Sequence, residues 1–311
     1  MLRRMLLAAS ASHRVRQVIT TAPYTRDVVT RFVAGDSADD ALQVTRRLLA
    51  DGLLVTLDYL GEHTADRDQA AAVADEYIRL LARLGSAGLA SGGRAEVSVK
   101  PTAVGLGLDE HGQKTAAENI ARICAAARDA GTTVTLDMEE HTAVGPTLQI
   151  LAGLRLDFPD LGCVLQSYLR RSADDCADLA VAGSRIRLCK GAYRAPDVAA
   201  FGSRAEVDRS YARCLRILLA GECYPMFATH DPRLIKIAGV RAATAGRAPG
   251  SFEYQMLYGI RPAEQLRLAS GGARVRVYVP YGNDWYGYLV RRLAERPANL
   301  AFFLRSLVST G

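Results

Sequence analysis

The chain has 311 residues, of which 49% are hydrophobic and 23% charged, a composition typical of a globular enzyme. No apolar run approaches the roughly 18 residues needed to cross a bilayer, so the sequence excludes an integral membrane protein. The formal net charge is +6, but the arginines are dispersed among acidic residues without a dense basic block, which argues against nucleic-acid binding.

The six cysteines show no CxxC or Cys/His metal spacing, and several lie inside apolar runs. This usage predicts a reduced, cytoplasmic protein without a structural metal. The N-terminus carries arginines and no acidic residue before Asp27, as in some signal or transit peptides. Its apolar stretch is shorter than that of a typical signal peptide, so we expect an amphipathic helix that packs on the domain.

Eight short β-branched or apolar runs follow one another along the chain and predict eight strands. They are GLLVTLDYL (52–60), AEVSVKP (95–101), TTVTLDM (132–138), GCVLQSYL (162–169), SRIRLCKG (184–191), CYPMFATH (223–230), GSFEYQML (250–257) and ARVRVYVP (273–280).

Segments with helical periodicity lie between the strands and after the last one. They include DRDQAAAVADEYIRLLARL, KTAAENIARICAAARDA, SADDCADLAVA, AEVDRSYARCLRILLA, DPRLIKIAGVRAATA, RPAEQLRLA and NDWYGYLVRRLAER. This alternation predicts an α/β protein with a (β/α)8 barrel. We expect residues 1–45 to form an N-terminal helical segment and residues 46–311 to form one catalytic barrel domain.

An open doubly wound sheet is the competing fold. It would normally carry GxGxxG after its first strand, but the first strand here is followed by LGEHTADRD. The only GxG, in VGLGLDEHG after the second strand, lacks the third glycine, and we interpret it as a flexible loop.

Polar residues stand at the predicted carboxyl ends of the strands, where the chemistry of a barrel collects. They are Asp58, Glu62, Lys100, Asp137, Glu139, Glu140, Gln166, Tyr168, Arg187, Lys190, Tyr193, Thr229, His230, Gln255 and Tyr278. Any one of them can be a salt-bridged rim residue or a solvated loop residue. Together they indicate a ligand, because an unpaired buried ion costs several kcal/mol.

The neighbouring arginines Arg291 and Arg292 lie in the predicted helix after the eighth strand. If that helix tips across the barrel mouth, the two guanidinium groups can grip one small carboxylate from two directions. The alternative is an exposed basic helix in which Glu295 pairs with Arg291. The stretch alone does not choose between them.

Seven segments of the chain resemble the flavin-dependent proline dehydrogenases, particularly the short monofunctional bacterial type. They are LDYLGE (57–62), VSVKPTAVG (97–105), TLDMEEH (135–141), RLCKGAYR (187–194), YPMFATHD (224–231), FEYQMLYGIRP (252–262) and YVPYGNDWYGYLVRRLAERPAN (278–299). The resemblance covers nearly the whole chain.

The resemblance implies a distorted (β/α)8 barrel with N-terminal helices, the last helix packed over the barrel mouth, and noncovalent FAD. It implies oxidation of L-proline to Δ1-pyrroline-5-carboxylate by hydride transfer, within proline catabolism toward glutamate. Electrons would pass to a membrane quinone, with peripheral contact at the inner face of the membrane. No aldehyde dehydrogenase domain is attached, so the product would go to a separate pyrroline-5-carboxylate (glutamate semialdehyde) dehydrogenase.

Residue by residue, the resemblance implies three groups of binding residues. The substrate group is Lys100, Tyr193, Leu257, Tyr278, Arg291 and Arg292. Glu62 would be a gate that pairs with Arg291 over bound substrate. The cofactor group is Met138, Gln166, Arg187, Lys190, Gly191, Ala192, Thr229 and His230. One departure is local: the sixth-strand motif ends in THD, where THN is as common.

Catalytic roles are expected for Asp137 and Arg187. Positive charge from Arg187 near the reactive part of the flavin would stabilise its anionic reduced form. We expect Asp137 and Lys100 to form a buried ion pair that orients the substrate amine. Glu62 and Arg291 would exclude water during hydride transfer.

Two other functions remain open at this point. One is a different flavin-dependent amine or amino-acid oxidising enzyme, or a lyase, on the same barrel, because fold does not fix function. The other is a non-catalytic basic protein that binds membranes or nucleic acid through its arginines.

Overall fold

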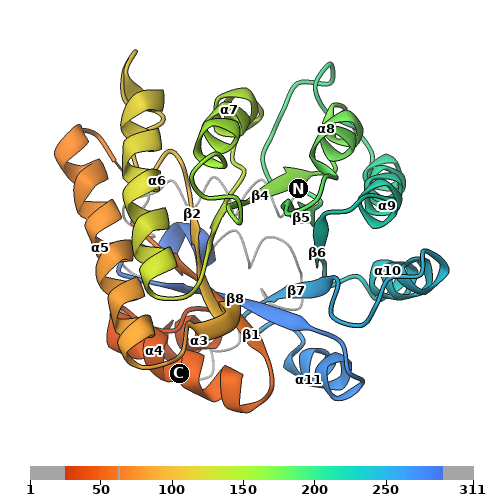
Figure 1. Ribbon diagram of the computed structural model, residues 1–311, viewed down its shortest axis with the longest axis horizontal. Coiled ribbons are helices and arrows are strands. Elements are labelled where there is room, and N and C mark those ends of the chain that lie inside the picture. Colours follow the sequence, from red (N-terminus) through yellow and green to blue (C-terminus); the bar gives the residue numbers. More distant parts are fainter. Residues whose placement is uncertain (1–24, 62–63, 290–311) are drawn as a thin grey trace, which may run out of the picture.

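The computed structural model describes residues 25–61 and 64–289. Eight parallel strands form a closed barrel in chain order, and helices surround it (Figure 1). Each of the eight predicted runs contains one strand, which confirms the (β/α)8 fold. The strands are β1 (Leu54–Tyr59), β2 (Ala95–Val99), β3 (Val134–Leu136), β4 (Gly162–Gln166), β5 (Arg185–Cys189), β6 (Tyr224–Ala228), β7 (Glu253–Leu257) and β8 (Val275–Tyr281).

The helices between the strands agree with the segments named from the sequence, and one more lies between β3 and β4. They are α5 (Arg67–Ser86), α6 (Gly112–Asp129), α7 (Val144–Leu154), α8 (Ser172–Leu179), α9 (Arg204–Ala220), α10 (Pro232–Thr244) and α11 (Pro262–Ser270). Two single turns of 3-10 helix, Ser91–Gly93 and His141–Ala143, precede β2 and α7.

Side chains of the connecting loops fix where several helices begin. Ser203 forms a capping box with Glu206 at the start of α9, so two backbone N–H groups without intrahelical partners are satisfied. At α10 the carboxylate of Asp231 accepts from the N–H of Arg233, and Pro232 occupies the first helical position. Each helix therefore starts at a fixed distance from the strand end before it.

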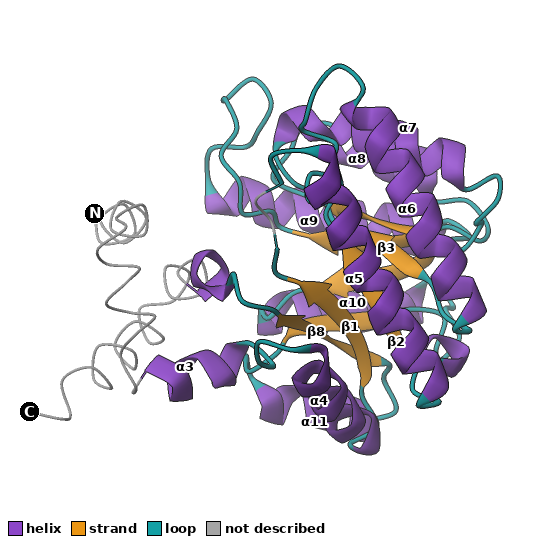
Figure 2. Ribbon diagram, turned by 90° about the vertical axis from the view of Figure 1, so that its left-hand side faces the viewer, coloured by secondary structure: helices purple, strands orange, loops and turns teal. Residues whose placement is uncertain are grey.

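Among the described residues, two helices precede the barrel strands: α3 (Thr25–Phe32) and α4 (Ala38–Ala50). The predicted boundary between residues 45 and 46 lies within α4, and the division of the chain at that point stays a prediction. Val29 and Phe32 of α3 pack with Leu60 and Ile260, which follow β1 and β7. Helix α3 therefore lies at the end of the barrel where the strands finish (Figure 2).

The barrel closes between its first and last strands. Six residues of β1 align with β8, from Leu54 opposite Arg276 to Tyr59 opposite Tyr281. Arg276 also donates to the carbonyl of Val55 at 2.9 Å and to that of Gly93 at 3.1 Å, which ties the junction from inside. This long register holds the strand ends in fixed positions around the mouth.

Residues 285–289 continue into a helix after β8. The sequence predicts that this helix packs over the barrel mouth. Most of its residues lie outside the described part of the chain, so the packing stays a prediction. Across residues 25–61 and 64–289, no helix combines the length and the apolar character that a membrane span requires.

Candidate active site

Polar side chains fill the barrel interior in two layers, because alternate residues of a strand point to the same side. The upper layer lies toward the carboxyl ends of the strands and the lower layer toward their amino ends. Hydrogen bonds between side chains of different strands define the two layers. The upper layer is Asp58, Ser98, Asp137, Arg187, Gln255 and Tyr278, and the lower layer is Thr56, Glu96, Arg185, Glu253 and Arg276.

Asp137, directly after β3, is the centre of the upper layer. Its Oδ1 accepts from Arg187 Nη1 at 2.7 Å and from Ser98 Oγ at 2.7 Å, and its Oδ2 accepts from the Tyr278 hydroxyl at 2.6 Å. Burial, and then the carboxylates of Asp137 and Asp58, raise the pKa of Tyr278 well above its usual value. Tyr278 therefore stays protonated and donates to Asp137.

Lys100 pairs mainly with Asp58, and its expected ion pair with Asp137 is the longer and weaker of the two. Its Nζ lies 2.6 Å from Oδ1 and 2.7 Å from Oδ2 of Asp58, and 4.0 Å from Oδ2 of Asp137. Asp58 is 1% exposed and Lys100 is 9% exposed, so the pair is almost completely removed from water. The reason is competition, because Arg187, Ser98 and Tyr278 already occupy the oxygens of Asp137.

Arg187 is 4% exposed, and its guanidinium group is held from two sides. Nε donates to Gln255 Oε1 at 2.5 Å, and Nη1 donates to Asp137 and Ser98. Its Cζ lies 5.4 Å from the centre of the Tyr278 ring, so the cation also faces the π-system of that ring. A cation is thus fixed inside the barrel, at the middle residue of β5 and not at the end of that strand, where the sequence analysis places it.

Two predicted cofactor residues, Met138 and Gln166, lie together beside this centre. Gln166 Nε2 donates to the carbonyl of Met138 at 3.1 Å, and both side chains are buried. Gln166 Oε1 is buried without a hydrogen-bond partner within the described part of the chain, as is the hydroxyl of the neighbouring Tyr168. These two atoms lack the partners that buried polar atoms usually have.

Gly191 has a positive φ of +95°, and the ring of Tyr168 packs directly against it. A Cβ at this position would lie 2.2 Å from Tyr168 Cδ1, so only glycine fits. Gly191 therefore lets the ring of Tyr168 pack directly on the backbone between Lys190 and Ala192.

Lys190 is held by two carboxylates that the sequence analysis did not single out, and His230 by the predicted substrate residue Leu257. Lys190 Nζ lies 2.5 Å from Asp208 Oδ1 and 3.5 Å from Asp231 Oδ2. His230 Nε2 accepts from the backbone N–H of Leu257 at 2.9 Å, so that nitrogen carries no proton. The preceding Thr229 accepts from the N–H of Asp231 through its hydroxyl.

The other predicted substrate residues lie in two places. Leu257 ends β7 and packs on the cluster that includes α3, and Tyr193 packs near Met138 and Tyr168. Both side chains are partly exposed. Glu62, Arg291 and Arg292 lie outside the described residues.

The sequence analysis did not single out Ser98 and listed Gln255 only as a polar residue at a strand end, although both contact the central residues. Period-two alternation along a strand would have found Ser98, since it precedes Lys100 by two positions on the same face. The same rule places Gln255 beside Glu253 and Tyr278 beside Arg276. Alternation gives the face of each residue but not its partner across the barrel.

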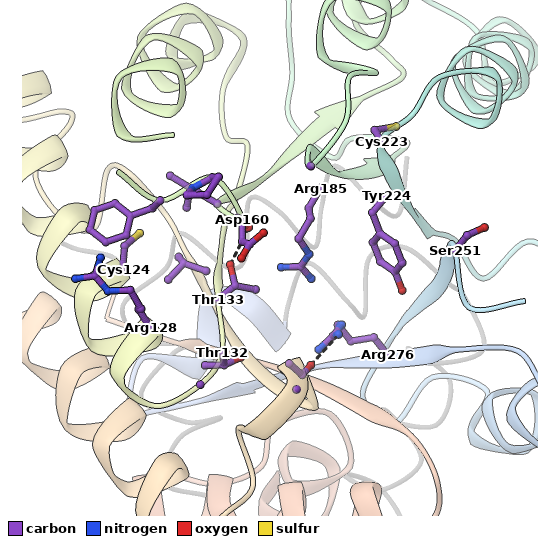
Figure 3. A pocket seen from close by; sticks show the side chains of 18 of the residues that line it. Cys124, Arg128, Thr132, Thr133, Asp160, Arg185, Cys223, Tyr224, Ser251 and Arg276 are labelled. Atoms are coloured by element: carbon purple, nitrogen blue, oxygen red, sulfur yellow. Dashed lines mark hydrogen bonds between the residues drawn. The ribbon is translucent and has the colours of Figure 1, made fainter. Parts of the chain in front are cut away.

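A cavity of about 760 Å³ opens at the opposite end of the barrel, where the strands begin (Figure 3). Arg185 and Arg276 reach into it and pair with the buried carboxylates of Glu96 and Glu253. Arg247 donates four hydrogen bonds to backbone carbonyls at and beyond the end of α9. These arginines offset buried acids and a helix terminus, so we place the catalytic site at the other mouth.

Comparison with known proteins identifies the family that the chain resembles. The pattern of the family described as proline dehydrogenase matches residues 41–305. The chain is 41% identical over 280 residues to a proline dehydrogenase of Deinococcus radiodurans, covering 89% of each chain. It is 38% identical over 278 residues to proline dehydrogenase 1 of Bacillus subtilis, covering 89% of this chain and 90% of the relative.

A solved structure shares the fold. The proline utilization A protein (PutA) of Bdellovibrio bacteriovorus, inactivated by N-propargylglycine, superposes with a TM-score of 0.81 at 26% identity. The match covers 87% of this chain and 33% of the PutA chain, so this chain spans about a third of that protein's length.

Proposed function

The chain belongs to the proline dehydrogenase family and oxidises L-proline, and we propose that it does so with FAD, forming Δ1-pyrroline-5-carboxylate. The observation that carries the proposal is the arrangement around Asp137. One carboxylate there holds a buried guanidinium group and a protonated phenol toward the carboxyl ends of the strands. This constellation suits a small substrate that must lie against a flavin in a single orientation.

The upper layer forms one side of the proposed proline site. Tyr278, which is fixed by Asp137, supplies a ring surface for the pyrrolidine ring, and Leu257 and Tyr193 supply further apolar surface. Lys100 is held by Asp58 close to the same place. Arg291 and Arg292, outside the described residues, would bind the carboxylate of proline with two planar guanidinium groups.

The described residues fit a flavin. Gln166 Oε1 is a buried acceptor without a partner in the described chain, which suits the imide N–H of an isoalloxazine ring. The segment of Lys190, Gly191 and Ala192 holds the ring of Tyr168, whose buried hydroxyl also lacks a partner in the described chain and suits a polar atom of the cofactor. Arg187 supplies positive charge, which favours an anionic reduced flavin. Met138, Thr229 and His230 complete the proposed cofactor contacts.

Lys190 would serve the phosphate end of the cofactor. Its charge is shared with Asp208 and Asp231, and Arg233 lies 3.2 Å from Asp208 and 2.9 Å from Asp231. The two cations and two carboxylates form a network that an incoming phosphate can enter by taking one cation from its partner. A phosphate that binds here must compete with the carboxylates of Asp208 and Asp231 for Lys190 and Arg233.

In the reaction, a carbon–hydrogen bond beside the ring nitrogen of proline breaks, the nitrogen loses a proton, and a carbon–nitrogen double bond forms. When bound, the flavin supplies the acceptor for the hydride. Asp137 keeps Arg187 and Tyr278 in fixed positions. The positive charge of Arg187 and the ring of Tyr278 therefore need not move during the reaction. Glu62, outside the described residues, would pair with Arg291 as a gate that excludes water.

We propose that the electrons pass to a quinone in the membrane and that the protein meets the inner face of the membrane from the cytoplasm. The product would go to a separate pyrroline-5-carboxylate (glutamate semialdehyde) dehydrogenase. Like the proposal of FAD as cofactor, the proposal of these partners is supported by the membership of the chain in the proline dehydrogenase family.

The test is the visible spectrum of the purified protein before and after anaerobic addition of L-proline. We expect the absorbance of a bound flavin, bleached by L-proline and not by L-valine. A protein that carries a flavin but is bleached equally by other amines would be a different amine oxidising enzyme. A colourless protein that also fails to bind added FAD would overturn the proposal.

A further inference from the structure

The direction of the Arg187 guanidinium group depends on two competing carboxylates. Asp137 in the upper layer accepts from Nη1 at 2.7 Å. Glu96 in the lower layer lies on the other side, with Oε1 3.9 Å from Nη2, and Nη2 makes no hydrogen bond with any described residue. A rotation of the side chain toward Glu96 would take its charge away from the barrel mouth.

Gln255 decides between these two directions by holding the third nitrogen. Its Oε1 accepts from Arg187 Nε at 2.5 Å, and its Nε2 donates to Glu253 Oε1 at 2.6 Å. An amide flipped by 180° would lose both bonds, because a guanidinium group only donates and a carboxylate only accepts. Gln255 is 3% exposed, so water does not replace the lost partners.

Glu253 is itself fixed in position and in charge. Arg276 Nε donates to its Oε1 at 2.7 Å, and the Tyr224 hydroxyl donates to its Oε2 at 3.1 Å. Burial alone would raise the pKa of Glu253, but the charge and hydrogen bond of Arg276 outweigh it and lower the pKa. Glu253 is therefore ionised at neutral pH, so it only accepts hydrogen bonds and favours the orientation of Gln255 in which the amide nitrogen faces it.

We propose that Gln255 is a positioning residue for proline oxidation: oriented by Glu253, it keeps the Arg187 guanidinium group turned toward Asp137 and away from Glu96. The inference rests on the proposed placement of Arg187 beside the flavin. Loss of Gln255 lets the guanidinium group turn into the lower layer, which weakens the stabilisation of the reduced flavin and slows hydride transfer.

The experiment compares Gln255→Leu with the parent protein, both purified with bound flavin. We expect kcat for proline to fall about tenfold, with KM changed less than threefold. The redox equilibrium of the flavin should shift about tenfold against reduction, or about 30 mV for two electrons. A merely structural role would not move this potential. If Gln255→Leu does not fold, Gln255→Asn tests the same point, since its shorter amide cannot reach both partners.

Tyr224→Phe is the matched control. It removes a hydrogen bond from the same carboxylate, Glu253, but from the side away from Arg187. We expect the flavin potential and kcat of this variant to match the parent. An equal shift in Tyr224→Phe and Gln255→Leu would overturn the inference, because the effect would then come from Glu253 in general.

Arg187→Met, which removes the positive charge, separates the inference from the proposed function. A shifted potential in Arg187→Met with an unshifted one in Gln255→Leu would overturn the role of Gln255 and leave the proposed function standing. An unshifted potential in Arg187→Met itself would instead remove Arg187 from the neighbourhood of the flavin, and the inference with it.

Discussion

Both carboxylate oxygens of Asp58 lie within 2.7 Å of Lys100 Nζ, so two neighbouring strands, β1 and β2, are joined by a buried ion pair at the barrel mouth. Breaking such a pair by removing one partner leaves a buried charge without compensation, at a cost of about 3 kcal/mol. The 4.0 Å separation from Asp137 gives Lys100 no equal substitute.

Asp58→Asn is therefore expected to lower the free energy of unfolding by about 3 kcal/mol, seen as a drop of several degrees in melting temperature. Asp109→Asn is the control, because Asp109 is half exposed in its pair with Arg67 and such pairs contribute about 0–1 kcal/mol. Equal melting temperatures for Asp58→Asn and Asp109→Asn would contradict the larger contribution to stability expected of the buried Asp58–Lys100 pair.

Gly191→Ala is expected to lose the bound flavin and to destabilise the protein. The positive φ alone costs about 1–3 kcal/mol, and the new Cβ would collide with the Tyr168 ring. The readouts are the ratio of flavin to protein and the melting temperature. Gly183→Ala has a similar φ of +78° but no atom within 4 Å, so it should show the backbone cost alone and keep its flavin. Full flavin content in Gly191→Ala would contradict the proposed cofactor cradle.

The ionisation of Glu96 makes the free energy of unfolding depend on pH. Burial would raise its pKa, but Arg185, Arg276 and Arg187 together hold the pKa at about 2. A folded-state pKa below the unfolded value, about 4.3, gives stability that is present above that value. This stability is lost as the pH falls toward 2.

The melting temperature of the parent should therefore fall from about pH 4.3 downward. Glu96→Gln should melt lower than the parent at pH 7, and the gap should narrow as the pH is lowered. Glu118→Gln, at an exposed site on α6, should track the parent throughout. A gap for Glu96→Gln that stays constant between pH 7 and 2.5 would mean that Glu96 is not ionised in the folded protein.

Arg292→Lys tests the predicted carboxylate clamp. An ammonium group cannot present the planar fork of a guanidinium group, so KM for proline should rise roughly 10- to 100-fold, the equivalent of one charged hydrogen bond. Steady-state kinetics measure it, with Arg267→Lys at an exposed site on α11 as the control. An unchanged KM would leave the proline carboxylate without the partner proposed for it.

The positions of the strands could be predicted because each is a short β-branched or apolar run followed by a polar residue. Helix α7 was harder to find, since VGPTLQILAGL contains two glycines and a proline that weaken its helical pattern. Its existence follows from the structure, where a connection between parallel strands β3 and β4 must cross the outside of the barrel.

The partner of Lys100 could not be predicted in the same way. Asp58 and Asp137 lie at the ends of the two strands that flank β2, so the sequence presents them as equal neighbours. The choice depends on which carboxylate other donors have already taken, and those donors come from β2, β5 and β8. The roles of Glu62, Arg291 and Arg292 stay predictions.

The junction of β1 with β8 has a consequence for synthesis on the ribosome. The chain emerges from its N-terminus, so β1 leaves the exit tunnel more than 200 residues before the strand that completes it. Throughout that interval one hydrogen-bonding edge of the nascent sheet is bare and open to other chains.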